Sequence, residues 1–125
     1  MRRLLYLAPL LAALACKDST STATRTWSVT WSAAVEGGTG QIDSVAWREH
    51  TSPYSHTGPM VSWNWTAPLA AGKQVFLRVR GSTTSPALIR ARINATSSGQ
   101  SPFGTDITCS GTDTYCQIGP LTLPQ

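Results

Sequence analysis

Apolar and polar residues alternate over several short stretches of this chain, with turn-forming residues between them. The clearest stretch is residues 27–33, where every second residue is apolar and the others carry hydroxyl groups. Strict alternation is typical of a β-strand with one buried face, because successive side chains point to opposite sides of the strand. Further strands are predicted at residues 41–49, 60–66, 73–81, 87–95, 105–110 and 115–123.

These stretches predict a small all-β domain. About seven strands in roughly a hundred residues, joined by short connections, favour antiparallel pairing and an Ig-like β-sandwich. Residues 50–59 hold two prolines and one glycine and are expected to form a loop. The predicted core consists of inward-facing strand residues, namely Val29, Trp31, Val45, Trp47, Val61, Trp63, Val75, Leu77, Val79, Ile89, Ala91 and Ile93.

Residues 1–15 have the three parts of an export signal. Arg2 and Arg3 form a basic start, residues 4–14 are almost entirely apolar, and small residues stand one and three positions before the expected cut. The apolar run is about eleven residues long, well short of the roughly 20 that a membrane-spanning helix needs. A cleaved signal peptide is therefore predicted rather than a permanent anchor.

The segment Ala-Ala-Leu-Ala-Cys at residues 12–16 resembles the lipobox of bacterial lipoproteins. The resemblance implies that the sulfur of Cys16 takes a diacylglyceryl group, that residues 1–15 are removed, and that the new amino terminus is acylated. An ordinary secretory signal followed by a chance cysteine is the alternative. Several acyl chains give stable attachment to a membrane, and the Ser/Thr-rich residues 16–26 would then act as a flexible tether with a reach of about 17 Å.

The expected location is the bacterial cell envelope, with the β-sandwich domain at residues 27–125 facing the periplasm or the exterior. Lys17 stands where some bacteria read an inner-membrane retention signal, which is usually Asp, and Asp18 comes one place too late. This favours the outer membrane over the inner one.

Three cysteines would leave one stray thiol in an oxidising compartment. If Cys16 carries lipid, Cys109 and Cys116 remain as a pair, and the segment between them is expected to be a tight hairpin closed by a disulfide. Such a bond would stabilise the fold by about 2–3 kcal/mol and agrees with export. Half a metal site is the weaker alternative, because the spacing is too wide for a zinc knuckle and the sequence offers no second ligand pair.

Charge and motifs limit the possible functions. Removal of Arg2 and Arg3 with the signal lowers the formal net charge from +4 to +2, which gives no strong case for nucleic acid. The sequence has no recognisable nucleophile elbow, phosphate-binding glycine loop or carboxylate pair, so we expect no enzymatic activity, cofactor or metal. His50 and His56 flank the predicted loop without the spacing of a zinc site, and a small hydrolase or metal protein is the least favoured alternative.

The order of the strands resembles the soluble domain of the MmpS family, small envelope proteins that accompany RND-type lipid exporters. The likeness covers residues 27–116: an aromatic-rich first strand, a glycine-rich turn, strands containing Trp47 and Trp63, an apolar strand led by Gly72, an Ile-rich strand and a late cysteine. It implies a β-sandwich with an accessory role beside a transport system. The chain departs from the family in having a lipobox instead of a membrane-spanning N-terminus, and no cysteine on the Ile-rich strand.

Four arginines make the most distinctive candidate site. Arg78 and Arg80 alternate with apolar residues on one predicted strand, and Arg90 and Arg92 do so on the next. If these strands form a hairpin, symmetrical pairing sets Arg80 beside Arg90. Arg78 then lies beside Arg92, on an outer face that also carries Phe76. Guanidinium groups bind phosphates and carboxylates well, so this face is a hypothetical site for anionic lipid head groups, an acidic glycan or an acidic envelope protein. A solvated polar face is the competing interpretation.

Five tryptophans raise another possibility, because aromatic side chains stack on sugars. Trp31, Trp47 and Trp63 fall at inward positions, where Trp is usually part of the core, whereas Trp27 and Trp65 lie near strand ends, where exposure is plausible. The sequence thus predicts a non-enzymatic envelope lipoprotein that serves as a binding module or as an accessory to an RND-type transport system. A carbohydrate-binding module displayed on the cell surface is the alternative.

Overall fold

The structure is a computed structural model that describes residues 25–125. The expected signal peptide, Cys16 and most of the expected tether lie outside the described residues. The described residues form eight strands: β1 (Thr26–Glu36), β2 (Gly40–Glu49), β3 (Ser52–Met60), β4 (Ser62–Ala70), β5 (Gln74–Thr83), β6 (Leu88–Thr96), β7 (Phe103–Cys109) and β8 (Thr114–Thr122). Within residues 25–125 there is no helix that could cross a membrane.

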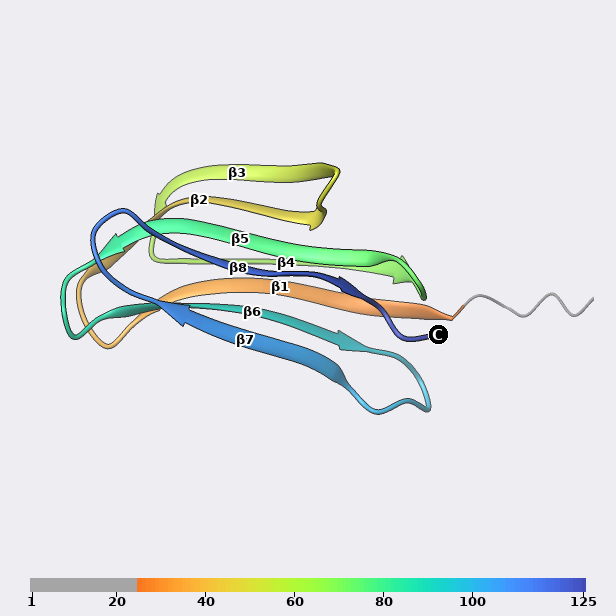
Figure 1. Cartoon of the computed structure of the whole chain (residues 1–125). Coiled ribbons are helices and arrows are strands. Elements are labelled where there is room, and N and C mark those ends of the chain that lie inside the picture. Colours follow the sequence, from red (N-terminus) through yellow and green to blue (C-terminus); the bar gives the residue numbers. More distant parts are fainter. Residues whose placement is uncertain (1–24) are drawn as a thin grey trace, which may run out of the picture.

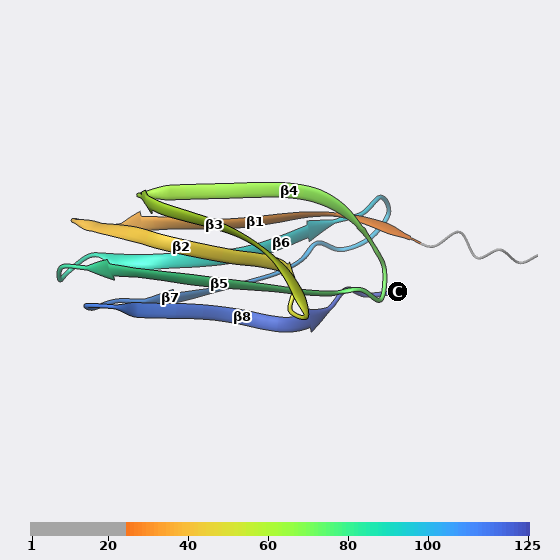
Figure 2. The same ribbon diagram turned by 90° about the horizontal axis from the view of Figure 1, so that it is seen from above.

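The strands form two four-stranded antiparallel sheets that face each other, which confirms the predicted small β-sandwich (Figures 1 and 2). Sheet A has the order β4-β1-β6-β7, and sheet B has the order β3-β2-β5-β8. Only the β2–β3 and β6–β7 connections stay within one sheet, and each other connection crosses to the opposite sheet. The edge strands β3 and β4 therefore lie at one side of the sandwich, and β7 and β8 lie at the other.

The core fills the space between the central strands of the two sheets. The inward residues of β1, β2, β5 and β6 are buried, as alternation predicts. The confirmed core predictions are Val29, Trp31, Val45, Trp47, Val75, Leu77, Val79, Ile89, Ala91 and Ile93. Burial of these side chains on both inner faces supplies the main driving force for the fold.

Two expectations about the residues before β4 were wrong. Residues 52–60 form the edge strand β3 instead of a loop, which makes eight strands in place of about seven. Its prolines are compatible with this place, because an edge strand does not need every backbone N–H for pairing. Val61 is 63% exposed and not part of the core. It is the single residue between β3 and β4, where the chain turns from one sheet to the other.

The chain ends close the sandwich at the end where β1 begins (Figure 1). The indole Nε1 of Trp27 donates a hydrogen bond to the carbonyl oxygen of Pro124 at 2.8 Å, and Trp27 is only 1% exposed. The guanidinium of Arg25 donates to the carbonyl oxygen of Gln125 at 2.7 Å. Exposure of Trp27, which its place near a strand end made plausible, is therefore wrong, because the C-terminal segment covers it.

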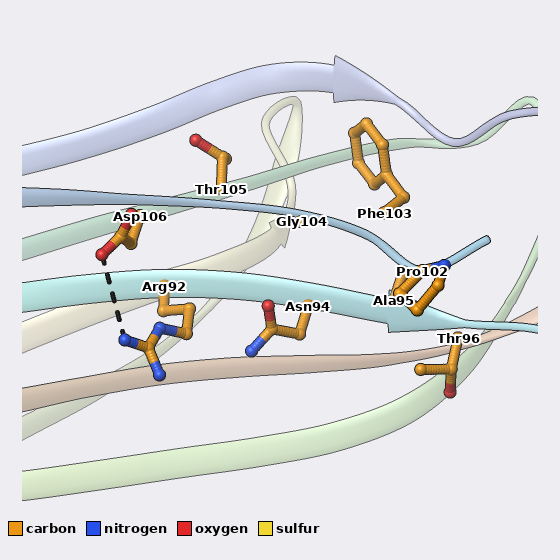
Figure 3. A pocket seen from close by; sticks show the side chains of 9 residues that line it. All are labelled: Arg92, Asn94, Ala95, Thr96, Pro102, Phe103, Gly104, Thr105 and Asp106. Carbon is orange, nitrogen blue, oxygen red and sulfur yellow. Dashed lines mark ion pairs between the residues drawn. The ribbon is translucent and has the colours of Figure 1, made fainter.

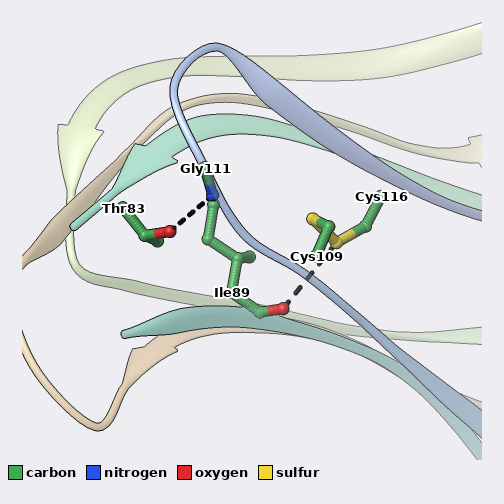
Figure 4. The surroundings of a disulfide bond; sticks show 5 residues. All are labelled: Thr83, Ile89, Cys109, Gly111 and Cys116. Carbon is green, nitrogen blue, oxygen red and sulfur yellow. Dashed lines mark hydrogen bonds between the residues drawn. A yellow bond between two sulfur atoms is a disulfide. The ribbon is translucent and has the colours of Figure 1, made fainter. Parts of the chain in front are cut away.

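The predicted disulfide joins Cys109 at the end of β7 to Cys116 on β8, with 5.7 Å between the Cα atoms (Figure 4). The enclosed segment is not a hairpin within one sheet, because β7 belongs to sheet A and β8 to sheet B. The disulfide therefore links the two sheets. The Sγ atom of Cys116 lies 3.7 Å from the carbonyl oxygen of Ile89, a contact within the core and not a true hydrogen bond, since a disulfide sulfur carries no proton.

Candidate functional site

The predicted hairpin of the two arginine-bearing strands is wrong, and the four arginines therefore do not share a face. Arg78 and Arg80 lie on β5 of sheet B, whereas Arg90 and Arg92 lie on β6 of sheet A. The connection between the strands crosses the sandwich, and both strands place their apolar residues in the core between the sheets. The two pairs consequently point to opposite outer faces.

The pair on sheet A is neutralised by carboxylates. The guanidinium of Arg90 donates hydrogen bonds to Glu36 on β1 at 2.9 Å and to Asp106 on β7 at 2.6 Å. These two hydrogen bonds raise the pKa of Arg90 above its ordinary value. Arg92 lies 3.9 Å from the same Asp106. Two positive and two negative groups thus balance each other here, which leaves little net attraction for an anionic ligand.

A hollow lies beside this neutral cluster, between β6 and β7 (Figure 3). Gly104 shapes it, because a Cβ atom at this position would lie only 2.5 Å from the amide oxygen of Asn94. Arg92 lines the hollow, but its guanidinium turns toward Asp106 (Figure 3). The rest of the lining gathers no further charge, so the hollow offers space without a set of groups that would define a ligand.

The pair on sheet B keeps its charge. Arg78 and Arg80 are exposed and stand two residues apart on one strand, which separates their Cα atoms by about 7 Å. Gln117 and Tyr115 on β8 lie directly opposite them, and the four side chains line a shallow hollow of about 310 Å³. On the other neighbouring strand, β2, the partners of the two arginines are small, Ala46 and Ser44. The guanidinium groups therefore have free space around them.

The contacts of this pair are few and weak. The Nε of Arg78 donates to the amide oxygen of Gln117 at 3.1 Å, and Arg78 has no ion pair with any described residue. Arg80 lies 3.3 Å from Asp113, but the two side chains are 57% and 73% exposed. Such exposed pairs contribute little, typically 0–1 kcal/mol. Both arginines can therefore turn toward a ligand at small cost.

Phe76 is not an exposed member of this face. It is 1% exposed, and its ring meets the ring of His50 edge-on at a centroid distance of 5.2 Å. The pairing of β5 with β8 is irregular between Val75 and Leu77, so Phe76 has no regular partner there, and the turn that carries His50 covers it. The expected ligand contact at Phe76 is thus replaced by Tyr115, which is 62% exposed.

A group of aromatic side chains lies at the side of the sandwich formed by β3 and β4. We call it the aromatic edge, and it consists of Trp47, Tyr54, Trp63 and Trp65. Trp47 is buried at its base, with ring centroids 4.5 Å from Trp63, 5.6 Å from Trp65 and 6.0 Å from Tyr54. Trp63 is half-buried against the core, while Tyr54 and Trp65 are exposed.

The two histidines come from different segments of the described chain. His50 lies in the turn after β2, and His56 lies on β3. Among residues 25–125 there is no group of three or more His, Cys, Asp or Glu side chains placed to hold a metal ion.

Comparison of the chain with family models, with curated proteins and with solved structures finds no match in any of the three. The resemblance to the MmpS family and to the lipobox therefore stays a prediction.

Sequence reasoning missed Tyr54, Tyr115 and Gln117. Tyr54 fell in the predicted loop, although Tyr54 and His56 alternate in register with Trp47 and Val45 on β2. The prolines in that stretch favoured its interpretation as a loop in spite of this alternation. Tyr115 and Gln117 alternate with Cys116 and Ile118 on β8, and this pattern could have placed them on the outer face.

Proposed function

We propose that the protein is a lipid-anchored, non-enzymatic binding module of the bacterial cell envelope, and that its ligand carries negative charge. The lipid anchor is proposed on the lipobox resemblance at Cys16. The observation that supports an anionic ligand is the exposed pair Arg78 and Arg80, which line the same hollow and, among residues 25–125, form an ion pair with a single exposed carboxylate, that of Asp113. Arginine forks bind phosphate or carboxylate oxygens in a bidentate manner.

The geometry of attachment favours an acidic glycan or protein over the head groups of the anchoring membrane. The lipid would hold the end of the sandwich where β1 begins at Thr26. The start of β5 lies at this same end, because the backbone N–H of Ala71, shortly before β5, donates to the backbone carbonyl oxygen of Arg25. Arg80 stands six residues further along β5 from Gln74, about 20 Å from that end. The arginines are thus presented on the side of the domain, away from the attachment point.

Binding of a soluble polyanion tests the proposal. The purified protein in non-ionic detergent is expected to bind polygalacturonate, a carboxylate polymer, and polyphosphate at low salt, and to lose both as salt screens the charges. The double variant Arg78→Gln and Arg80→Gln should lose most of this binding. Arg92→Gln on the opposite face is the matched control and should keep it. Equal binding by the double variant and by wild type would contradict the proposal.

Attachment is tested separately by intact mass. The purified product should lack residues 1–15 and carry a diacylglyceryl group and an additional acyl chain on Cys16, and Cys16→Ser should keep its leader. An unmodified thiol at Cys16 would refute the anchor without touching the arginine pair. The accessory role beside an RND-type transport system, proposed on the MmpS resemblance, predicts co-purification with such a transporter after crosslinking in cells.

A further inference from the structure

The aromatic edge is a second candidate binding surface, and it lies on a different side of the domain from the arginine pair. Tyr54 and Trp65 are 46% and 44% exposed although both occupy inward positions, opposite Trp47 and Trp31 in their sheets. Edge strands β3 and β4 belong to different sheets, and β3 places only Tyr54 and His56 at its first inward positions. Polar or amphipathic residues there leave the side of the sandwich open.

The two exposed rings are held in place from below. Each lies against the buried ring of Trp47, at centroid distances of 5.6 Å for Trp65 and 6.0 Å for Tyr54. Aromatic pairs at such distances attract each other beyond the effect of area burial. The rings are therefore pre-ordered, and a ligand that stacks on them loses little additional side-chain entropy.

Hydrogen-bonding groups adjoin the rings. The guanidinium of Arg48 lies over one face of the Tyr54 ring, with its carbon 4.9 Å from the ring centroid, and Nη1 of Arg48 donates to the Tyr54 hydroxyl at 3.0 Å. A sugar would therefore stack on the opposite face of Tyr54. His56 is exposed at the next inward position of β3. Apolar ring faces with donors and acceptors at their margin match a pyranose, which has a C–H face and hydroxyl groups around its rim.

Other occupants fit this edge less well. Pro53 and Pro59 on β3 and Pro68 on β4 remove backbone donors, which disfavours the addition of a partner strand. Two half-exposed rings and Val61 also provide only a small part of the roughly 800 Å² that each partner buries in a stable protein interface. One or two sugar rings need far less surface.

We infer that the aromatic edge is a saccharide-binding platform, with Trp65 and Tyr54 as the stacking rings. Its ligand is a chain of pyranose units whose equatorial substituents leave a flat C–H face, as in β-1,4-linked glucose or N-acetylglucosamine. Such a chain can come from the glycan strands of the cell wall or from an external polysaccharide. This site goes beyond the anionic ligand proposed above and does not depend on it.

Binding to defined saccharides tests the platform. The purified protein, in a detergent without a sugar head group, is titrated with cellohexaose and chitohexaose while tryptophan fluorescence is followed. Retention on peptidoglycan sacculi, compared with retention on cellulose and chitin, distinguishes a cell-wall source from an external one. Trp65→Ala and Tyr54→Ala are expected to weaken binding about tenfold each. Trp65→Phe, which keeps a ring, should bind with an intermediate affinity.

Matched controls separate this result from a general loss of structure or of charge. Ile107→Ala removes an exposed apolar side chain from β7, at the opposite side of the sandwich, and should bind as wild type does. The double variant Arg78→Gln and Arg80→Gln should lose polyanions but keep saccharides. The inference is overturned if no tested saccharide binds, or if Trp65→Ala and Tyr54→Ala bind with unchanged affinity. A Trp65-dependent dimer in place of saccharide binding would also overturn it.

Discussion

Thr83 and Gly111 are joined by two hydrogen bonds at one end of the sandwich, one of which is drawn in Figure 4. The backbone N–H of Gly111 donates to the hydroxyl of Thr83 at 2.9 Å, and the backbone N–H of Thr83 donates to the carbonyl oxygen of Gly111 at 2.9 Å. Gly111 lies in the turn that crosses between the sheets after the disulfide-bonded Cys109, and Thr83 ends β5. The contact therefore fixes the crossing turn to the end of sheet B.

Replacement of Thr83 by valine tests the value of the hydroxyl. Val has almost the same shape but cannot accept the Gly111 N–H, which would then lack its partner in a partly buried site. We expect a loss of about 1–2 kcal/mol in the free energy of unfolding, measured by urea denaturation. Thr84→Val, which removes the hydroxyl of the neighbouring exposed residue, should change stability by less than about 0.5 kcal/mol. Equal losses of stability in Thr83→Val and Thr84→Val would show that the loss does not come from the hydrogen bond to Gly111.

The disulfide between Cys109 and Cys116 should stabilise the domain mainly by restricting the unfolded chain. The enclosed loop is short, with a sequence separation of 7, and the chain-entropy model gives about 2–3 kcal/mol for it. Urea denaturation with and without a reductant should show a loss of that size. The double variant Cys109→Ala and Cys116→Ala should start from the lower stability and no longer respond to the reductant. A response in that variant would point to another redox-sensitive group.

The alternation of apolar and polar residues was enough to find the central strands and their buried faces. It worked for β1, β2, β5 and β6, since each has neighbours on both sides and a fully covered inner face. It failed at β3, because an edge strand needs no apolar inner face and tolerates Pro53 and Pro59. The disulfide was predictable because the lipobox resemblance assigns Cys16 to lipid, and the two cysteines that remain lie close together in sequence.

The candidate sites were less predictable, because they depend on how strands pair over long distances. Arg80 and Arg90 look like partners in a hairpin from their spacing alone, but the chain between them crosses from sheet B to sheet A. Residues far apart in sequence decide which arginine stays available to a ligand. Glu36 on β1 forms an ion pair with Arg90, whereas no carboxylate of the described chain pairs with Arg78. Alternation defines a face but does not assign the strands to sheets.

Gly81 is expected to tolerate no side chain. A Cβ atom there would overlap the carbonyl oxygen of Gln41 on β2 and lie 2.8 Å from the Cδ1 atom of Ile89 on β6. The backbone of β2 cannot move away easily, since Gly81 pairs with Ile42 next to the irregularity of that strand. We expect Gly81→Ala to lower the free energy of unfolding by about 1–3 kcal/mol, as overpacking of a dense core does. Urea or thermal denaturation measures the change.

A glycine without close neighbours provides the comparison for Gly81. Gly99 has a φ of +73°, and a Cβ atom there would meet nothing within 4 Å. Gly99→Ala should therefore cost only the strain of the left-handed backbone, about 1 kcal/mol. If Gly81→Ala proved no more harmful than Gly99→Ala, the close approach of β2 and β6 to β5 would not hold in solution.

The exposure of the tryptophans makes a prediction that needs no ligand. Trp27, Trp31 and Trp47 are buried, Trp63 is half-buried, and Trp65 is 44% exposed. Acrylamide or iodide should therefore quench a minor fraction of the intrinsic fluorescence readily and the rest poorly. Trp65→Phe should remove most of the easily quenched fraction, whereas Trp27→Phe should leave it in place. A readily quenched signal that persists in Trp65→Phe would mean that another indole is exposed, and the aromatic edge would then not have the arrangement described for it.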